Sequence, residues 1–209
     1  MGSFGRDGDA ETAGGGRIVI LADSITLAGN GEKLAANGRP EADLVRKAYS
    51  LEGGSGGYIY VKTFNQHSSN KLDEKSNISA KGGLGIGDHT GGSGGVIVFD
   101  QGFEIAASNV HANGGKADKD DFGDGCYNGG SGTIYYRQND TLLVDNRGVN
   151  TTALTLLRVP NGKELVGDRK ELAKKLSVRK GARVKIQGEH RDMTFDELSI
   201  LDNSWFELS

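Results

Sequence analysis

The phrase Gly-Gly-Ser-Gly-Gly at residues 53–57 leads directly into the β-forming cluster Tyr58-Ile59-Tyr60-Val61. The same phrase returns 38 residues later, at residues 91–95, and again introduces a run of β-branched and aromatic residues. Internal repeats of this length are typical of proteins that stack one structural unit on the next. The remaining copies are Gly129-Gly130-Ser131-Gly132 before Thr133-Ile134-Tyr135-Tyr136 and the weaker Gly14-Gly15-Gly16 before Arg17-Ile18-Val19-Ile20.

Each repeat contains a second landmark, a short strand of small residues that ends in glycine. It reads Leu34-Ala35-Ala36-Asn37-Gly38 in the first repeat and recurs at residues 78–83 and 110–115. Residues 25–27 and 103–105 are plausible third strands between the landmarks. Asn-Gly and Gly-Gly favour backbone with positive φ, so we expect sharp turns between the strands at these pairs.

The C-terminal part, residues 151–209, lacks the glycine phrase but keeps a period. Leu176-Ser177-Val178 recurs after 22 residues as Leu198-Ser199-Ile200. Residues 182–186 recur after the same interval as residues 204–208. The sequence therefore predicts one domain over residues 1–209, with glycine-rich repeats of about 38 residues over 14–150 and glycine-poor repeats after them.

These repeats predict an all-β fold, a three-sided parallel β-helix (β-solenoid) with long loop insertions, and we expect right-handed winding. A single repeat cannot bury its own apolar side chains, whereas stacked repeats join them into continuous columns. We expect Ile18, Ile59, Ile97 and Tyr135, or their immediate neighbours, to form one column. A β-sandwich with glycine-rich hairpins is the alternative. Residues 41–49 and 164–176 are interpreted as loops or short helices.

The glycine phrase, the following β cluster and the closing Ala-Asn-Gly-Gly at residues 112–115 resemble the glycine-rich repeats of extracellular and cell-surface proteins. The resemblance covers residues 14–150 and, more loosely, the C-terminal part. It implies a β-helical stalk, adhesin or matrix module, and it carries no catalytic residue across.

Composition and charge narrow the classes of partner. The formal net charge of −3 argues against nucleic acid as a main partner, because phosphate binding needs a basic surface. No apolar run is long enough to span a membrane. Asn77, Asn139 and Asn150 each begin an N-glycosylation sequon, which favours an extracellular or cell-surface glycoprotein.

Four aspartates crowd one loop within residues 116–128, which gives a candidate calcium site, since Ca²⁺ is bound by clustered carboxylate oxygens. The loop fails the EF-hand pattern, and nearby lysines partly neutralise it, so we expect a solvated acidic loop and no cofactor. The four residues are Asp118, Asp120, Asp121 and Asp124.

We expect no enzymatic activity. Carbohydrate cleavage needs two carboxylates placed across one bond, and no acidic residue recurs at the same phase of successive repeats. A carbohydrate-binding or polysaccharide-cleaving β-helix remains the alternative function. The glycine runs are followed by strands, whereas a phosphate loop needs a helix.

Trp205 and Phe206 lie in the last β-forming cluster, and no polar capping segment follows them before Ser209. An uncapped end of a stack exposes unpaired backbone groups that can pair with another strand. We therefore expect the chain to associate with itself end to end, or to adjoin further repeats of the same kind, as part of a filament.

Overall fold

In a computed structural model, the regular secondary structure of the described residues is all β-strand, and no α-helix occurs among them. The described residues are 13–27, 33–39, 52–64, 71–72, 76–87, 89–100, 109–117, 128–158, 173–187 and 195–208. The strands are β1 (Arg17–Ala22), β2 (Thr26–Leu27), β3 (Lys33–Ala35), β4 (Tyr58–Thr63), β5 (Lys71–Leu72), β6 (Asn77–Ser79), β7 (Val96–Phe99), β8 (Val110–His111), β9 (Thr133–Tyr136), β10 (Thr141–Asp145), β11 (Thr155–Arg158), β12 (Lys175–Arg179), β13 (Arg183–Gln187), β14 (Glu197–Ile200) and β15 (Trp205–Leu208).

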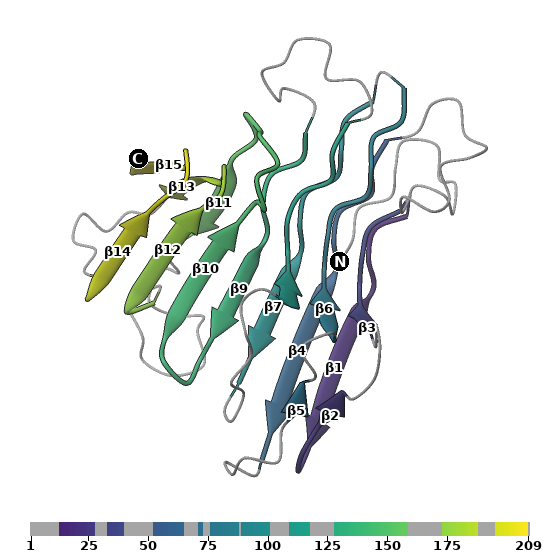
Figure 1. Cartoon of the computed structure of the whole chain (residues 1–209), viewed down its shortest axis with the longest axis vertical. Helices are drawn as coiled ribbons and strands as arrows, with labels where there is room; N and C mark the ends of the chain where they lie inside the picture. Colours follow the sequence, from purple (N-terminus) through teal and green to yellow (C-terminus); the bar gives the residue numbers. More distant parts are fainter. Residues whose placement is uncertain are drawn as a thin grey trace.

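The main sheet has seven strands in the order β1-β4-β7-β9-β10-β12-β14, and Figure 1 shows them side by side from purple to yellow. The strands that follow the glycine phrases pair in parallel and in register, so that Ile18, Ile59, Ile97 and Ile134 form one column. The predicted column is confirmed, with its fourth member one residue before Tyr135. The small-residue landmarks form a second parallel sheet, β3-β6-β8.

The 22-residue period is also confirmed. Leu176 pairs with Leu198, and Val184 pairs with Phe206, in parallel strands of two different sheets. The second of these sheets has the order β11-β13-β15. Lys175 and Leu176 belong to β12, so the interpretation of residues 164–176 as a loop or short helix is wrong at its C-terminal end. The corresponding interpretation of residues 41–49 and the third strand at 103–105 lie outside the described residues.

The chain reverses its direction once within the main sheet. Strands β9 and β10 form an antiparallel pair, joined by a turn over residues 137–140. The strands before this turn run one way, and β10, β12 and β14 run the other way (Figure 1). The main sheet is thus two parallel stacks joined by one hairpin, a feature the repeat pattern alone does not predict.

The two stacks bury opposite faces of the main sheet. Successive side chains of a strand point to opposite faces. Ile134 of β9 and Leu143 of β10 belong to the core shared with the β3-β6-β8 sheet. Their neighbours Tyr135 and Leu142 contact the other core, which is shared with the β11-β13-β15 sheet. The β3-β6-β8 sheet and the β11-β13-β15 sheet therefore cover opposite faces of the main sheet.

The glycine phrases are extended segments, and the expected positive-φ turns at Gly-Gly and Asn-Gly are wrong. The described glycines with positive φ are Gly87, Gly148 and Gly181, none of them in a phrase. In the phrase at residues 53–57, the direction in which the backbone N–H groups donate repeats every three residues. Gly53 and Gly56 donate to the next repeat, and Gly54 and Gly57 donate to the facing layer. This period is that of a polyproline II segment.

Close packing of the two layers explains why glycine is required there. A Cβ on Gly56 would lie 2.2 Å from the carbonyl oxygen of Ala80, and one on Gly94 would lie 1.8 Å from that of Ala112. The adjacent Gly95 donates its backbone N–H to Ala80 at 2.7 Å. Two backbones that bond across layers in this way leave no room for a side chain.

Candidate functional site

The sequence-predicted site residues are distributed over several regions. Asp118, Asp120, Asp121 and Asp124 lie outside the described residues, and among the described residues no group of His, Cys, Asp and Glu is placed to hold a metal. Asn139 and Asn150 are exposed, whereas Asn77 is half-buried and its side-chain oxygen contacts His111. Glycosylation at the three sequons stays a prediction. No helix in the described part of the chain is long and apolar enough to cross a membrane.

The last pair of strands, β14 and β15, leaves the second core open. We call Leu198, Ile200, Phe206 and Leu208 the open end. Leu198, Ile200 and Leu208 are 44%, 43% and 63% exposed, whereas their partners Leu176, Val178 and Ile186 in the preceding repeat are 1%, 0% and 2% exposed. The same columns that are sealed inside the stack therefore reach solvent at its last described repeat.

Trp205 and Phe206, the residues predicted for self-association, have different environments. Phe206 packs partly against the second core and continues the column of Val184. Trp205 lies on the other side of β15, where the guanidinium of Arg183 lies 4.9 Å from its ring centroid. Leu198, Ile200 and Leu208 are each exposed to a larger fraction than Trp205, which is 38% exposed.

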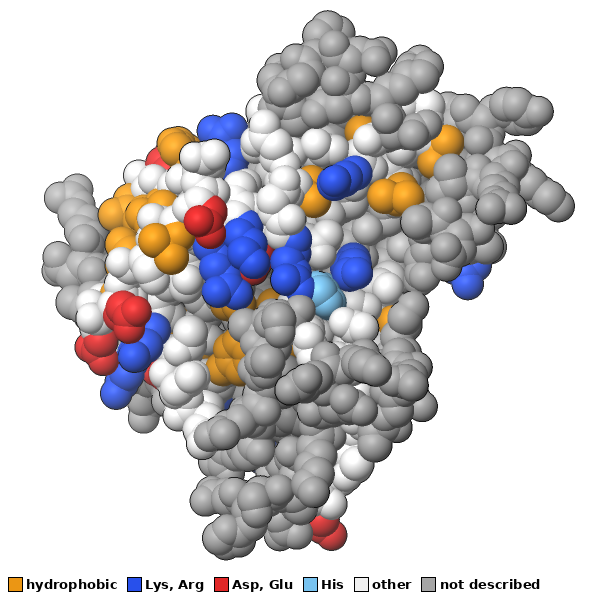
Figure 2. Space-filling view, in the orientation of Figure 1, with side chains coloured by type: hydrophobic (Ala, Val, Ile, Leu, Met, Phe, Trp, Pro, Cys, Tyr) orange, Lys and Arg blue, Asp and Glu red, His pale blue; other side chains and the backbone are white. Residues whose placement is uncertain are grey.

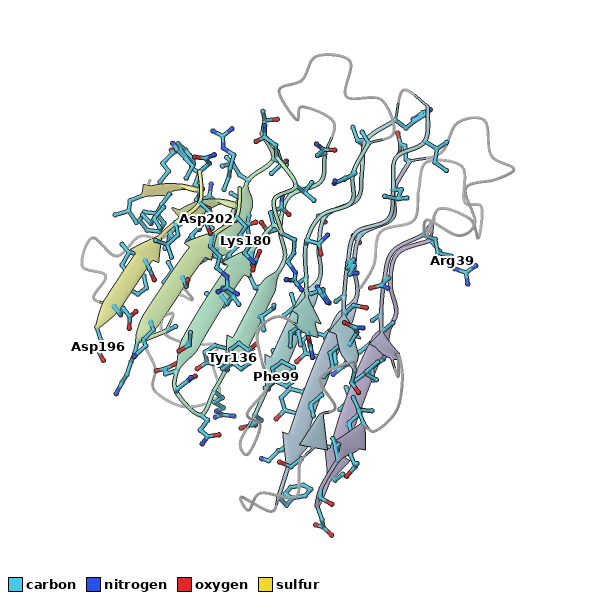
Figure 3. The ribbon with its side chains drawn as sticks, viewed as in Figure 1. Arg39, Phe99, Tyr136, Lys180, Asp196 and Asp202 are labelled. Carbon is cyan, nitrogen blue, oxygen red and sulfur yellow. The ribbon has the colours of Figure 1, made fainter. Side chains whose placement is uncertain are left out.

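Three stacked turns lie at the ends of β10, β12 and β14. Each turn has positive φ at both central residues, as in a type I′ turn, and the first central residues are Arg147, Lys180 and Asp202. Backbone bonds join the turns, because Gly148 donates to the carbonyl of Lys180 and Gly181 donates to that of Asp202. Arg147, Lys180 and Asp202 therefore form a row along the stack, and Figure 3 labels the last two.

Basic side chains gather around the first two turns. We call Lys81, Arg147, Arg179 and Lys180 the basic cluster. Figure 2 shows blue Lys and Arg side chains near the centre of one face, with a histidine beside them.

Asp145, which is 5% exposed, is the carboxylate at the base of this cluster. It accepts from Arg179 Nε at 2.9 Å and from the backbone N–H of Arg147 at 2.7 Å. The Nζ of Lys180 lies 3.9 Å from it.

His111 connects the basic cluster to the first stack. Its Nδ1 accepts from Arg147 Nε at 2.9 Å, so the neutral ring carries its proton on Nε2, which lies 3.2 Å from Asn77 Oδ1. Burial and the charges of Arg147 and Lys81 lower the pKa of His111 to about 4, against a smaller opposing effect of Asp145. The imidazole is therefore uncharged at neutral pH and adds no positive charge to the cluster.

A second polar network lies on β4 and β7. Asp100, which follows β7 and is almost fully buried, accepts from the hydroxyl of Tyr60 at 2.5 Å and from Arg137 at 3.0 Å. Lys62 Nζ is 3.9 Å from the same carboxylate. These contacts join three adjacent strands of the first stack, so we interpret this network as structural.

The sequence analysis missed the basic cluster, although a signal is present. Arg147-Gly148 and Lys180-Gly181 each place a basic residue before a glycine at the end of a β cluster. The two turns are recognised as equivalent only once β10 is known to pair with β12. Paired residues of these strands are 34 residues apart, which fits neither the 38-residue nor the 22-residue period.

Comparison with protein families, with curated proteins and with solved structures gives no match for this chain.

Proposed function

We propose that the chain is a non-enzymatic segment of a β-solenoid, part of an extracellular fibre, coat or matrix, and that it associates end to end through the open end. The observation that carries the proposal is the exposure of Leu198, Ile200 and Leu208 in columns that are sealed one repeat earlier. Apolar surface contributes about 25 cal/mol per Å² when it is removed from water, so covering these columns favours association.

Parallel, in-register pairing of strands from successive repeats supports winding as a solenoid. In the first stack the chain contributes to three sheets in turn, through β1, β2 and β3, and the next repeat pairs with each of them. This order supports a three-sided coil. The second stack has two described sheets, with pairs β10-β12-β14 and β11-β13-β15.

The switch of packed face supports one sense of winding throughout. Between the two stacks the strand direction reverses, and the face that the chain folds towards reverses with it. Reversing both the strand direction and the packed face leaves the handedness of the coil unchanged. Parallel crossovers are right-handed in nearly all proteins, so we propose that both stacks are right-handed coils. Because the strands of the second stack run in the opposite direction, right-handed crossovers require the β11-β13-β15 sheet to lie on the opposite face of the main sheet.

The extracellular setting is supported by the resemblance of residues 14–150 to surface-protein repeats and by the exposed sequons at Asn139 and Asn150. Backbone bonding between layers supports a rod held together without disulfides, since the chain has one cysteine.

Sedimentation velocity over about a hundredfold range of concentration tests the proposal, because association shifts with mass action. We expect Ile200→Lys, which places a charge at the open end, to weaken association at least about tenfold. Val96→Lys is the matched control, since Val96 is similarly exposed but lies on β7 inside the first stack. Wild-type protein that stays monomeric throughout, or equal weakening by both variants, contradicts the proposal.

A carbohydrate-binding protein is the second candidate function, and the specific observation that favours it is the basic cluster.

A further inference from the structure

We propose that the basic cluster binds a carboxylate or sulfate group of an acidic polysaccharide. The site does not depend on self-association through the open end, because it is built from the turns after β10 and β12 and from the first stack. Its ligand-binding groups are the guanidinium of Arg179 and the ammonium of Lys180, with Arg147 next to them in the row of turns.

The contacts of Arg179 leave its outer edge available for a ligand. Asp145 takes up Nε of Arg179, and among the described residues neither terminal nitrogen of this guanidinium has a partner. The side chain is 26% exposed, so these nitrogens can be reached from solvent. Two parallel N–H groups of a guanidinium match the two oxygens of a carboxylate or sulfate.

Lys180 supplies a second charge at the same place. Its ammonium is 3.9 Å from Asp145, beyond ordinary hydrogen-bond length, and its side chain is 41% exposed. Among the described residues, one buried carboxylate thus serves two cations, Arg179 and Lys180, which gives this pair an excess of positive charge. Anions are attracted to such a site, particularly where one partner is partly buried.

Backbone conformation is a second, independent observation. Arg147 and Lys180 have φ of 57° and 53°, in the left-handed region that disfavours residues with a side chain. Glycine, asparagine and aspartate are the usual residues at these positions, and Asp202 fills the third one. Two long basic side chains at strained positions of adjacent repeats indicate selection for their charge, since strained residues concentrate at functional sites.

The charge pattern favours an acidic carbohydrate over a nucleic acid. The row of turns ends in Asp202, which repels a continuous polyanion, and the chain as a whole has a net charge of −3. A polysaccharide that carries a carboxylate or sulfate on only some of its sugars presents separate anions, and one such group fits between Arg179 and Lys180. Uncharged sugars of the polysaccharide can then lie along the polar face of β12 and β14, where Ser177 and Ser199 pair.

The test is calorimetric titration of the full chain with partly methyl-esterified oligogalacturonate, lightly sulfated dextran oligosaccharides and neutral dextran. We expect binding to one or both acidic ligands, and the two arms distinguish a carboxylate from a sulfate site. Neutral dextran should not bind. Absence of binding to both acidic ligands, or tighter binding to a single-stranded oligonucleotide of equal charge than to either, overturns the proposal.

Lys180→Asn is the decisive variant, because asparagine tolerates the left-handed conformation. We expect it to raise the melting temperature slightly while weakening acidic-ligand binding about tenfold. Asp202→Asn, at the equivalent turn position, should leave binding unchanged or tighten it. Lys175→Asn removes a cation of β12 outside the cluster and should change binding less than about twofold. Equal affinities of Lys180→Asn and the wild type overturn the proposal.

Discussion

Ile134 and Leu143 lie directly opposite each other in the antiparallel pair β9–β10, and both belong to the first core. The residues beside them, Tyr135 and Leu142, contact the second core. This hairpin is therefore the point where the two cores lie back to back across one sheet, and β10 is buried on both faces. Residues here connect the stability of one stack to that of the other.

Asn146 holds the joint between the stacks, and Asn146→Ala should lower the free energy of unfolding by about 2–4 kcal/mol. Its side chain is fully buried, accepts from the backbone N–H of Gly114 at 2.9 Å and donates to the carbonyl of Val149 at 2.6 Å. Alanine leaves both groups without partners. Urea denaturation measures the loss, and Asn139→Ala, at an exposed position, serves as the control. A loss below about 1 kcal/mol for Asn146→Ala contradicts this role.

Two substitutions within the glycine phrases should differ widely in their effect on stability. Gly94→Ala should destabilise the protein by at least about 3 kcal/mol, because its Cβ would lie 1.8 Å from a backbone oxygen that cannot move away cheaply. Gly16→Ala should be neutral or slightly stabilising, since nothing lies within 4 Å of the added methyl group. Thermal unfolding of both variants checks the prediction, and similar melting temperatures would disprove the close packing of the layers.

Two Tyr→Phe substitutions should have opposite signs. Tyr136 stacks on Phe99 with ring centroids 5.3 Å apart (Figure 3), and its buried hydroxyl has no hydrogen-bond partner among the described residues. Tyr136→Phe should therefore stabilise the fold by up to about 1 kcal/mol. Tyr60→Phe removes a donor from the buried Asp100 and should cost about 1–3 kcal/mol. Denaturant titrations of the two variants give the comparison, and destabilisation of similar size in both contradicts the assignment.

His111 predicts a pH dependence of stability. Its pKa in the folded protein is about 4, below the ordinary value of 6.5, so the unfolded chain binds the extra proton first. Stability should be constant above about pH 7 and fall as the pH drops towards 4, by about 1–2 kcal/mol after allowance for solvent screening. His111→Gln should lose this component. Denaturation at several pH values compares the two proteins, and identical profiles exclude His111 as the source.

The sequence predicts parallel pairing well, because the phrase at residues 53–57 and the 22-residue period fix which strands are equivalent. Ile59 with Ile97 and Val184 with Phe206 follow directly from those periods. The reversal after β9 could not be predicted, since its turn at residues 137–140 contains no glycine and resembles any polar loop. The structure differs from the positive-φ turns predicted at the glycine phrases for a physical reason. Glycine is required both where two backbones approach closely and where φ is positive, and the sequence alone does not tell which of the two reasons applies.

The candidate site was less predictable than the fold. The sequence predicts Trp205 and Phe206 at the end of the stack because they lie in the last β-forming cluster. The exposure of Leu198 and Ile200 follows only from the strand pairing, which places β14 at the edge of the main sheet among the described strands. The basic cluster unites Lys81 after β6, Arg147 in the turn after β10, and Arg179 and Lys180 at the end of β12, which lie far apart in the sequence. Their proximity depends on the reversal at β9–β10.

Hydrogen–deuterium exchange at low and high protein concentration tests the central claim, association through the open end, most directly. Edge strands expose backbone N–H groups that become protected when another strand pairs with them. We predict that protection of residues 197–208 rises with concentration in the wild type and not in Ile200→Lys, while protection of β7 and β9 stays constant in both. Concentration-independent exchange at residues 197–208, in protein that sediments as a monomer, would contradict the account.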